Sequence, residues 1–163
     1  MRSAVCPGSF DPVTNGHLDV FARASEMADQ VTVAVLVNRT KQSMFSLDER
    51  VTFIEASVAH LPNVAVDVFE GLLVDWCRAH DVQHVIKGLR AISDFDYELQ
   101  MAQLNFRLAG VETAFVSTNP QYSYLSSSIV KEVSQHGGDV TGLVPEIVRE
   151  ALTARYRTAS EGA

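Results

Sequence analysis

The amino-acid sequence predicts an α/β fold: a single Rossmann-like domain with a five-stranded parallel sheet flanked by helices. Three observations lead to this prediction. Short β-branched apolar runs alternate with segments of helical periodicity, polar or glycine-rich turns follow the apolar runs, and 163 residues fit one domain. Such alternation implies parallel strands joined by right-handed crossovers. No repeat or low-complexity linker divides the chain, so we expect one domain over residues 1–157 and a loose tail over residues 158–163.

The strands are predicted from short apolar runs. They fall at residues 4–6, 31–37, 64–69, 84–86 and 113–116. The run at 31–37 is almost continuously apolar, which is typical of a strand covered on both faces of a sheet. It ends in a polar loop that carries Lys41.

The helices are predicted from apolar spacing and capping residues. Apolar residues between Leu18 and Ala28 recur at helical spacing, and residues 46–49 form a capping box that opens a helix to about His60. Further helices are expected from residue 71 with Trp76 and Cys77 inward, over residues 94–108, around residues 129–133, and from Pro145 to about Tyr156.

Composition and charge exclude several classes of protein. A net charge of −7 argues against nucleic acid as the main partner, because phosphate backbones select basic surfaces. The longest mainly apolar run is far shorter than the ~20 residues of a membrane-spanning helix, and Pro7, Gly8 and Asp11 interrupt any signal peptide. Cys6 and Cys77 are too few for a disulfide framework, so we expect buried thiols in a reducing compartment. These features predict a cytoplasmic protein without a membrane partner.

The turn over residues 8–17 carries the first candidate site. Gly8 permits close approach of backbone to a ligand, and Thr14 or Asn15 can cap the following helix. Backbone N–H groups at a helix start attract phosphate. His17 would lie in the first helical turn and donate a hydrogen bond to a phosphoryl oxygen. The alternative is an ordinary strand–helix turn with a surface histidine.

Other polar residues also follow predicted strands. They are Lys41, the segment 87–90, and the segment 122–128 with its three serines. Ligands of open α/β sheets bind outside the carboxyl ends of the strands, at the topological switch point, so these residues would share one crevice. Its many donors and few acceptors suit a polyphosphate. The alternatives are a solvated charge at Lys41, a plain serine cap, and a surface pair between Arg90 and Glu98.

Several familiar motifs are absent. The sequence contains no G-x-G-x-x-G and no G-x-x-x-x-G-K-[ST], which argues against dinucleotide-dependent redox enzymes and P-loop nucleotidases. It also contains no G-x-S-x-G and no His/Cys cluster with metal-ligand spacing. We therefore expect no dedicated metal site in the protein.

Four segments together resemble a known family. Residues 8–17 (GSFDPVTNGH) look like the T/H-x-G-H signature of the nucleotidyltransferase superfamily. Residues 87–90 (KGLR), 94–98 (DFDYE) and 126–131 (SSSIVK) narrow the resemblance to the phosphopantetheine adenylyltransferase family. The similarity extends from about residue 3 to residue 156.

The resemblance implies a reaction and a set of site residues. The reaction is transfer of AMP from ATP to 4′-phosphopantetheine, which gives dephospho-coenzyme A and pyrophosphate. His17 and Lys41 would be catalytic. By motif position, the residues that bind ATP would be Ser9, Phe10, His17, Gly88, Leu89, Arg90, Glu98, Tyr122, Ser123, Tyr124, Leu125, Ser126, Ser127 and Ser128. The residues that bind phosphopantetheine would be Ser9, Lys41, Leu73 and Lys87.

Three positions depart from the forms associated with the family. Ser9 stands where threonine is frequent and keeps the hydroxyl. Tyr122 stands where another aromatic residue such as tryptophan is frequent. Lys87 replaces an arginine, which keeps the charge but loses the bidentate fork.

The chemistry of that reaction agrees with the residues present. The nucleophile is a phosphate that is already ionised at neutral pH, so no general base is needed. The reaction needs in-line alignment and stabilisation of charge at the α-phosphate, which His17 and the helix N-terminus would supply while Lys41 holds the attacking phosphate. We expect Mg²⁺ as the cofactor, held mainly by ATP and opposing the charge of the departing pyrophosphate.

Two alternative functions remain open. One is another adenylyl- or cytidylyltransferase of the same superfamily with a different acceptor, which the residues Lys41, Leu73 and Lys87 would decide. The other is a nucleotide-binding regulatory module without turnover, since α/β folds host many functions. His17 and Lys41 argue against the second, because a sensor does not need to stabilise charge at the α-phosphate.

The predicted helix over residues 94–108 has two apolar stripes. One stripe (Phe95, Leu99, Ala102 and Phe106) would cover the sheet of its own subunit, whereas the opposite stripe (Tyr97, Met101, Leu104 and Leu108) has no obvious intrachain partner. Since a soluble monomer rarely exposes such a patch, we expect self-association, unless another helix of the chain covers it. The resemblance implies a homohexamer built from two trimers, and it suggests feedback by coenzyme A.

Overall fold

The computed structural model describes residues 3–38, 42–90 and 92–160, and the side chains among them except those of residues 92–94 and 157–160. Lys41 therefore lies outside the described residues. The elements, in chain order, are β1 (Ser3–Gly8), α1 (Asn15–Met27), β2 (Gln30–Val37), α2 (Leu47–Val58), β3 (Val64–Glu70), α3 (Leu73–Ala79), β4 (His84–Leu89), α4 (Ile92–Ala109), β5 (Glu112–Ser117), the 3₁₀-helix η1 (Pro120–Tyr122), α5 (Ser127–Gln135) and α6 (Glu146–Ser160). This alternation confirms the predicted α/β class.

The five strands form one parallel sheet in the order β3-β2-β1-β4-β5. The chain moves outward from β1 to β3, then returns to the other side of β1 with β4. The strand order therefore reverses between β1 and β4, and the carboxyl ends of these two strands flank the switch point where ligands bind in such sheets.

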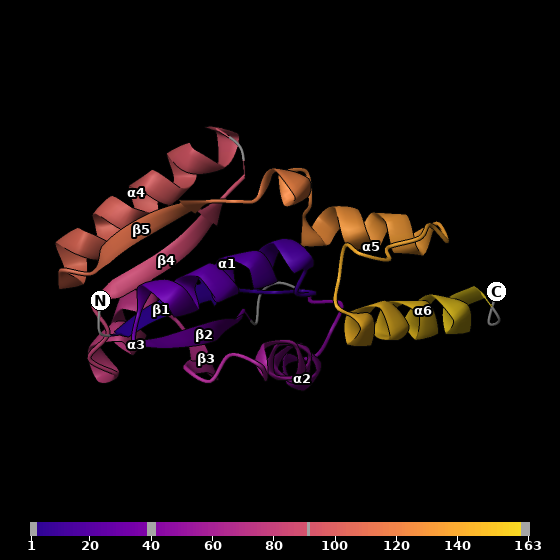
Figure 1. The fold of residues 1–163 in the computed structure, drawn as a ribbon, viewed down its shortest axis with the longest axis horizontal. Helices are drawn as coiled ribbons and strands as arrows, with labels where there is room; N and C mark the ends of the chain where they lie inside the picture. The colour runs from indigo at the N-terminus through magenta and orange to yellow at the C-terminus, as the bar shows by residue number, and fades with distance from the viewer. Residues whose placement is uncertain (1–2, 39–41, 91, 161–163) are drawn as a thin grey trace.

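Alternate residues of the central strands face two separate cores. Ala4 and Cys6 of β1 pack in a core with α1 and α2, whereas Val5 packs with Val74 and Cys77 of α3. The sheet is thus covered on both faces, which explains why β2 is almost continuously apolar. Figure 1 shows α1 and α2 on one side of the sheet, with α3 and α4 associated with the other. Trp76 and Cys77 are buried, as the sequence predicts.

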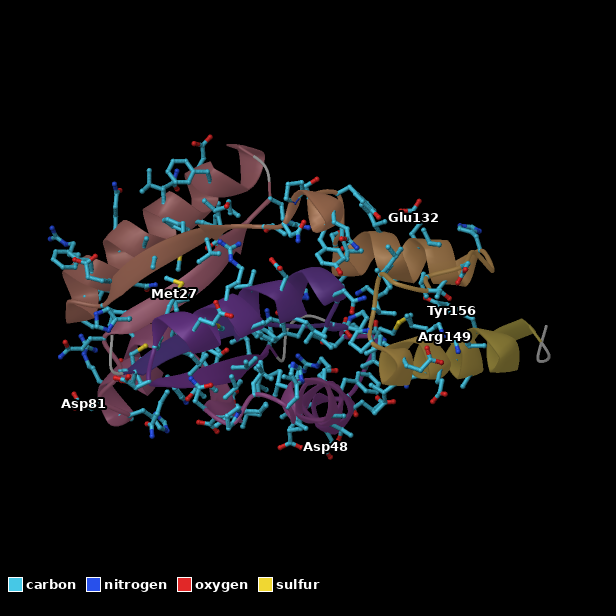
Figure 2. The ribbon with its side chains drawn as sticks, in the orientation of Figure 1. Met27, Asp48, Asp81, Glu132, Arg149 and Tyr156 are labelled. Carbon is cyan, nitrogen blue, oxygen red and sulfur yellow. The ribbon has the colours of Figure 1, made fainter. Side chains whose placement is uncertain are left out.

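The last two helices lie beyond the carboxyl ends of the strands (Figure 1). They pack against each other, and α6 also contacts α2. The hydroxyl of Tyr156 donates a hydrogen bond to the carbonyl of Lys131 at 3.3 Å, and Figure 2 shows Tyr156 beside the boundary between the two helices. α6 extends to Ser160, into the segment predicted as a tail.

The end of β4 differs from the sequence prediction. β4 continues beyond residue 86 through Leu89, because its pairing with β5 extends to Gly88 opposite Val116 and Leu89 opposite Ser117. The segment 87–90 therefore belongs mostly to the strand itself.

A Cβ atom on Gly88 would lie 2.6 Å from Cγ2 of Val20, so only glycine lets α1 pack this closely on β4.

The predicted faces of α4 are correct only in part. Phe95 packs edge-on against Phe115 of β5 at 5.8 Å between ring centroids. Phe106, which was expected to cover the sheet, is 54% exposed, and Asn105 is buried instead. One residue rotates a helix by about 100°, so the inward face passes through Asn105 and turns Phe106 outward. Among the described residues, no helix is both long and apolar enough to cross a membrane.

Candidate active site

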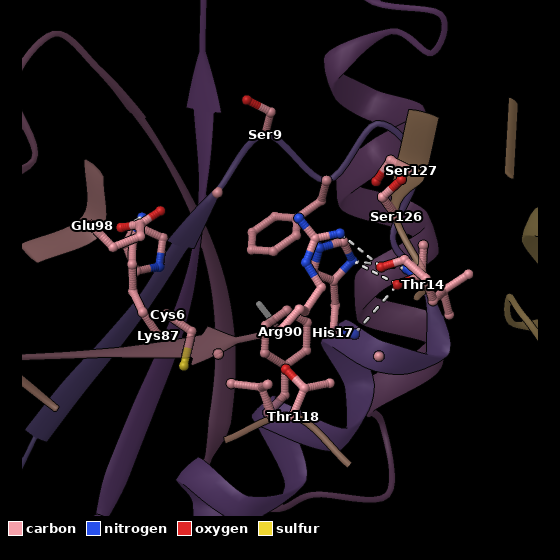
Figure 3. Close-up of a pocket in the computed structure, with 18 of the residues that line it drawn as sticks. Cys6, Ser9, Thr14, His17, Lys87, Arg90, Glu98, Thr118, Ser126 and Ser127 are labelled. Carbon is pink, nitrogen blue, oxygen red and sulfur yellow. Dashed lines mark hydrogen bonds and ion pairs between the residues drawn. The ribbon is translucent and has the colours of Figure 1, made fainter. Parts of the chain in front are cut away.

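A cavity of about 470 Å³ opens at the carboxyl ends of β1 and β4, at the predicted switch point. Its walls come from the turn after β1, the first turn of α1, the end of β4, one face of α4 and the start of α5. Figure 3 shows polar side chains from these segments around one space: Ser9, Thr14, His17, Lys87, Arg90, Glu98, Thr118, Ser126 and Ser127. The topology thus brings together residues that lie far apart in the sequence.

Phe10 shapes the wall of this cavity next to His17. Its φ of 46° lies in the left-handed region that non-glycine residues rarely adopt. The ring packs edge-on against His17 at 5.2 Å between centroids, and it covers Gly8, where a Cβ atom would lie 2.7 Å from the Phe10 ring. Gly8 is therefore required because it leaves room for this aromatic ring. Phe10 is buried, so its ring forms part of the cavity floor.

His17 takes part in an unusual capping box at the start of α1. The hydroxyl of Thr14 accepts the N–H of His17 at 3.4 Å, and Nδ1 of His17 accepts the N–H of Thr14 at 3.0 Å. A Glu or Gln usually returns the second bond. Because Nδ1 is the acceptor, the proton of the neutral ring lies on Nε2. The sequence analysis considered Thr14 and His17 separately and did not foresee that they form one unit.

The charge state of His17 follows from its surroundings. Burial, and secondarily the positive charge of Arg90, lower the pKa of His17 to about 4. The ring is therefore neutral at physiological pH, with an N–H group at Nε2. A neutral ring cannot attract an anion by net charge, but it can donate one oriented hydrogen bond.

Two cations approach the cavity from β4 and the residue after it. Nζ of Lys87 lies 2.8 Å from a carboxylate oxygen of Glu98, and both side chains are half-buried. Nη1 of Arg90 donates to the carbonyl of Leu125 at 2.8 Å, which connects β4 to the segment before α5. These contacts orient both cations before any ligand arrives.

The serines at the start of α5 form another wall of the cavity. Ser126 caps the helix by accepting the N–H of Ile129 at 3.1 Å, and the hydroxyl of Ser127 donates to the carbonyl of Pro12 at 2.7 Å. The helix N-terminus therefore borders the same space as the start of α1. Such an arrangement of two helix starts suits an anionic ligand.

A second cavity of about 220 Å³ adjoins the first. Its lining is mainly apolar and includes Leu73 and Val74 of α3, Phe69 of β3 and Met101 of α4. Five residues line both cavities: Pro7, Gly8, Lys87, Tyr97 and Glu98. The ion pair of Lys87 with Glu98 thus stands where a polar, donor-rich space meets an apolar one.

The structure places most of the predicted site residues in these two cavities. The predicted residues that line the larger cavity are Ser9, Phe10, His17, Lys87, Gly88, Arg90, Glu98, Leu125, Ser126, Ser127 and Ser128, while Leu73 lines the smaller one. Leu89, Tyr122, Ser123 and Tyr124 are not among the lining residues. Tyr122 instead packs beside Gly16 in the wall behind the site, where its Cβ atom would be 3.3 Å from a Cβ on that glycine.

Sequence reasoning missed several residues that border the site. Thr118 follows β5, and it could have been found by applying the strand-end rule to the fifth strand as well. Tyr97 was assigned to an apolar stripe, but it lies beside both cavities. Asp11 and Arg50 also make contacts that support the turn between β1 and His17. The local sequence gives no signal of these contacts, because their hydrogen-bond partners are distant along the chain.

Comparisons with known proteins agree with this geometry. The family model for cytidylyltransferase-like proteins matches residues 5–133. A phosphopantetheine adenylyltransferase of Streptomyces coelicolor is 59% identical over 157 residues, which cover 96% of this chain and 99% of that protein. The corresponding protein of Frankia alni is 59% identical over 159 residues (95% and 98%), and that of Thermobifida fusca is 53% identical over 156 residues (96% and 95%).

The match includes the strand–turn–helix around His17, β4 and the start of α5, so it contains most of the segments that build the larger cavity. The relatives match at nearly full length, so the similarity extends over the whole domain and not only over the motif. The chain belongs to the phosphopantetheine adenylyltransferases of the cytidylyltransferase-like family.

Proposed function

We propose that the enzyme transfers AMP from ATP to 4′-phosphopantetheine, forming dephospho-coenzyme A and pyrophosphate in coenzyme A biosynthesis. One observation carries this proposal beyond family membership: a polar cavity with two helix N-termini adjoins an apolar cavity at Lys87 and Glu98. ATP suits the first space by its charge. The second suits the long arm of an acceptor that ends in a phosphate, because methyl and methylene groups lie between the amide groups of that arm.

In this reaction an oxygen of the acceptor phosphate attacks the α-phosphorus of ATP. The new P–O bond forms as the bond from the α-phosphorus to the bridging oxygen breaks, and the bonding electrons leave with pyrophosphate. Since the acceptor phosphate is ionised, no residue needs to remove a proton. The protein aligns the two substrates and donates hydrogen bonds to the negatively charged oxygens of the reacting α-phosphate.

His17 supplies the donor best suited to that charge. Nε2 carries the proton of the neutral ring, because Nδ1 accepts the N–H of Thr14. The N–H groups at the start of α5 and the guanidinium of Arg90 would bind the remaining phosphates of ATP. Lys87 would hold the acceptor phosphate together with Lys41, which lies outside the described residues.

Mg²⁺ is proposed as a companion of ATP. Among the described residues, no group of three or more His, Cys, Asp or Glu side chains could hold a metal ion. Of the residues that the structure describes in the lining of the larger cavity, Glu98 alone carries a carboxylate, and it is paired with Lys87. This donor set fits an ion carried in by the phosphates of ATP, where it would offset negative charge on the pyrophosphate.

Further partners follow from the same two cavities. Coenzyme A combines an adenine nucleotide with a pantetheine arm, so it could occupy both spaces and inhibit by feedback.

The net charge of −7 gives no general attraction for nucleic acid. The free, buried thiols of Cys6 and Cys77 suit the reducing cytoplasm, where we place the enzyme.

We also propose self-association through α4, as a homohexamer by family resemblance. Its exposed apolar side chains include Tyr97 at 65%, Phe106 at 54%, Leu104 at 45% and Leu108 at 44%. Because Tyr97 borders both cavities, an interface over this helix would also stabilise the acceptor side of the site. The cost of leaving these side chains in water supports assembly over a monomer.

Pyrophosphate release from ATP tests the proposed reaction directly. Release is expected with 4′-phosphopantetheine and should be very slow with unphosphorylated pantetheine, which lacks both the nucleophile and the anchoring charge. Equal turnover of the two compounds, or preference for CTP over ATP, would indicate a different nucleotidyltransferase. ATP binding without pyrophosphate release in the presence of any phosphorylated acceptor would indicate a regulatory module.

A further inference from the structure

Asp11 is a buried carboxylate that lines neither cavity, yet it binds three donors. Oδ1 accepts the N–H of Phe45 at 2.9 Å, and Oδ2 accepts both the N–H of Met44 at 2.9 Å and Nζ of Lys131 at 3.0 Å. Burial by itself raises the pKa of Asp11. The two backbone N–H groups and the Lys131 ammonium together lower it by more, so the pKa lies below its usual value. The carboxylate is therefore negative at neutral pH.

The three donors come from two segments that are distant from Asp11 in the sequence. Met44 and Phe45 lie between β2 and α2, shortly after the predicted acceptor-binding Lys41, whereas Lys131 lies on α5. Asp11 itself follows β1 in the turn that leads to His17. One side chain thus connects the His17 turn, the β2–α2 segment and α5.

The contact with α5 is made at two consecutive residues of the turn. Ser127 and Lys131 are four positions apart and so lie on the same face of that helix. Ser127 donates to the carbonyl of Pro12, and Lys131 donates to the carboxylate of Asp11. The start of α5, whose serines line the larger cavity, is therefore fixed against the His17 turn in position and in rotation.

A second buried group supports the same turn from another side. Arg50 of α2 donates through Nη1 to the carbonyl of Ser9 at 2.7 Å and to that of Leu36 at 3.2 Å. It thereby joins the ends of β1 and β2. Arg155 of α6 also donates to the carbonyl of Met44. The segment that Asp11 binds is thus also connected to the last helix.

We propose that Asp11 is a positioning residue for the transfer reaction, acting with Lys131. It sets the distance between the phosphate-binding start of α5, the His17 turn and the β2–α2 segment that leads from Lys41, without touching either substrate. This inference rests on the proposed function, since in-line transfer is what requires the alignment. A misplacement of 1 Å in such a site can cost about 10²-fold in rate.

Three variants separate the parts of this arrangement. Asp11→Asn keeps the shape of the side chain but replaces one acceptor oxygen with an amide N–H₂ that cannot accept from Met44 or Lys131. Lys131→Met removes only the ammonium, and Lys131→Arg restores a cation. Asp67→Asn is the control, because Asp67 also accepts a backbone N–H (Val68) and a side-chain N–H (Trp76), but its donors belong to β3 and α3 and line neither cavity.

Loss of alignment should lower kcat far more than it changes KM for ATP. Asp11→Asn should lower kcat by about 10²-fold, while KM for ATP changes far less because the donors in the cavity remain. Lys131→Met should lower kcat by less, since both backbone contacts stay, and Lys131→Arg should recover most of the loss. Asp67→Asn should leave kcat unchanged, whatever the change in its thermal midpoint.

Unchanged kcat in a folded Asp11→Asn enzyme overturns the proposal. If that variant does not fold, Lys131→Met decides, because the half-buried ammonium can be removed without breaking the two backbone contacts of Asp11, and unchanged kcat again overturns the proposal. A loss in Lys131→Met that Lys131→Arg does not reduce also counts against the role of the ion pair.

Amide hydrogen exchange in the ligand-free protein keeps this inference separate from the proposed function. Asp11→Asn should speed exchange at Met44 and Phe45 and also in the first turn of α5. Acceleration confined to Met44 and Phe45 would show that Asp11 does not couple the two segments. If the wild type fails to use 4′-phosphopantetheine, the proposed function is wrong, but the exchange result still decides whether Asp11 connects them.

Discussion

Nδ1 of His17 accepts the backbone N–H of Thr14 at 3.0 Å. This contact both caps α1 and assigns the ring proton to Nε2, so one hydrogen bond serves folding and the proposed chemistry together. The arrangement explains how a histidine with a lowered pKa could serve in the proposed ATP site. In the proposed reaction it would act as a fixed neutral donor.

The first prediction concerns the rate. His17→Ala should lower kcat by about 10²–10³-fold, because loss of one donor to transition-state charge commonly has an effect of that size. KM for ATP should change far less, since Arg90 and the helix starts remain. Steady-state pyrophosphate release measures both constants, with His60→Ala as the control at an exposed histidine. Normal turnover with a collapsed ATP affinity would make His17 a binding residue only.

The second prediction concerns pH. The pKa of His17 is lowered from 6.5 to about 4 by burial and by Arg90, so between these values the unfolded chain binds a proton that the folded protein does not. The free energy of unfolding should therefore fall as pH falls from 6.5 toward 4, and it should fall more steeply in the wild type than in His17→Gln. Urea unfolding at several pH values measures this difference, and parallel curves would contradict it.

The third prediction concerns the pair at the junction of the cavities. Lys87→Met removes the cation that we propose holds the acceptor phosphate, and it leaves the carboxylate of Glu98 without this partner. Acceptor kcat/KM should fall by about 10- to 100-fold. The double variant Lys87→Met/Glu98→Gln should be less impaired, because the repulsive charge is gone. Arg107→Met on the exposed side of α4 is the control, and a double variant worse than the single one would refute the coupling.

The fourth prediction concerns assembly. Phe106 is 54% exposed on α4 and lines neither cavity. Phe106→Glu should lower the oligomeric mass in light scattering, because burying an unpaired charge in an apolar interface is unfavourable. Met27→Glu places the same charge on another exposed apolar residue, at the end of α1 (Figure 2). A monomeric wild type, or equal mass in all three proteins, would exclude the interface.

The sequence alone determined much of this protein. Apolar runs and capping residues located the strands and helices, and the strand-end rule brought His17, Lys87, Arg90 and the serines of α5 into one crevice. These predictions succeed because strand periodicity and helix capping are local. Strand ends were less well placed, since β4 continues through Leu89 only where β5 pairs with it.

Only the tertiary structure decided which residues face the site and which support it. Asn105 turned inward and Phe106 outward on a helix that is apolar on several sides, a choice that packing makes and periodicity cannot. The tautomer of His17 depends on where one backbone N–H lies, and the partners of Asp11 come from residues more than thirty positions away. Local sequence encodes which elements form, whereas the contacts that orient a reactive group depend on segments that meet only after the chain has folded.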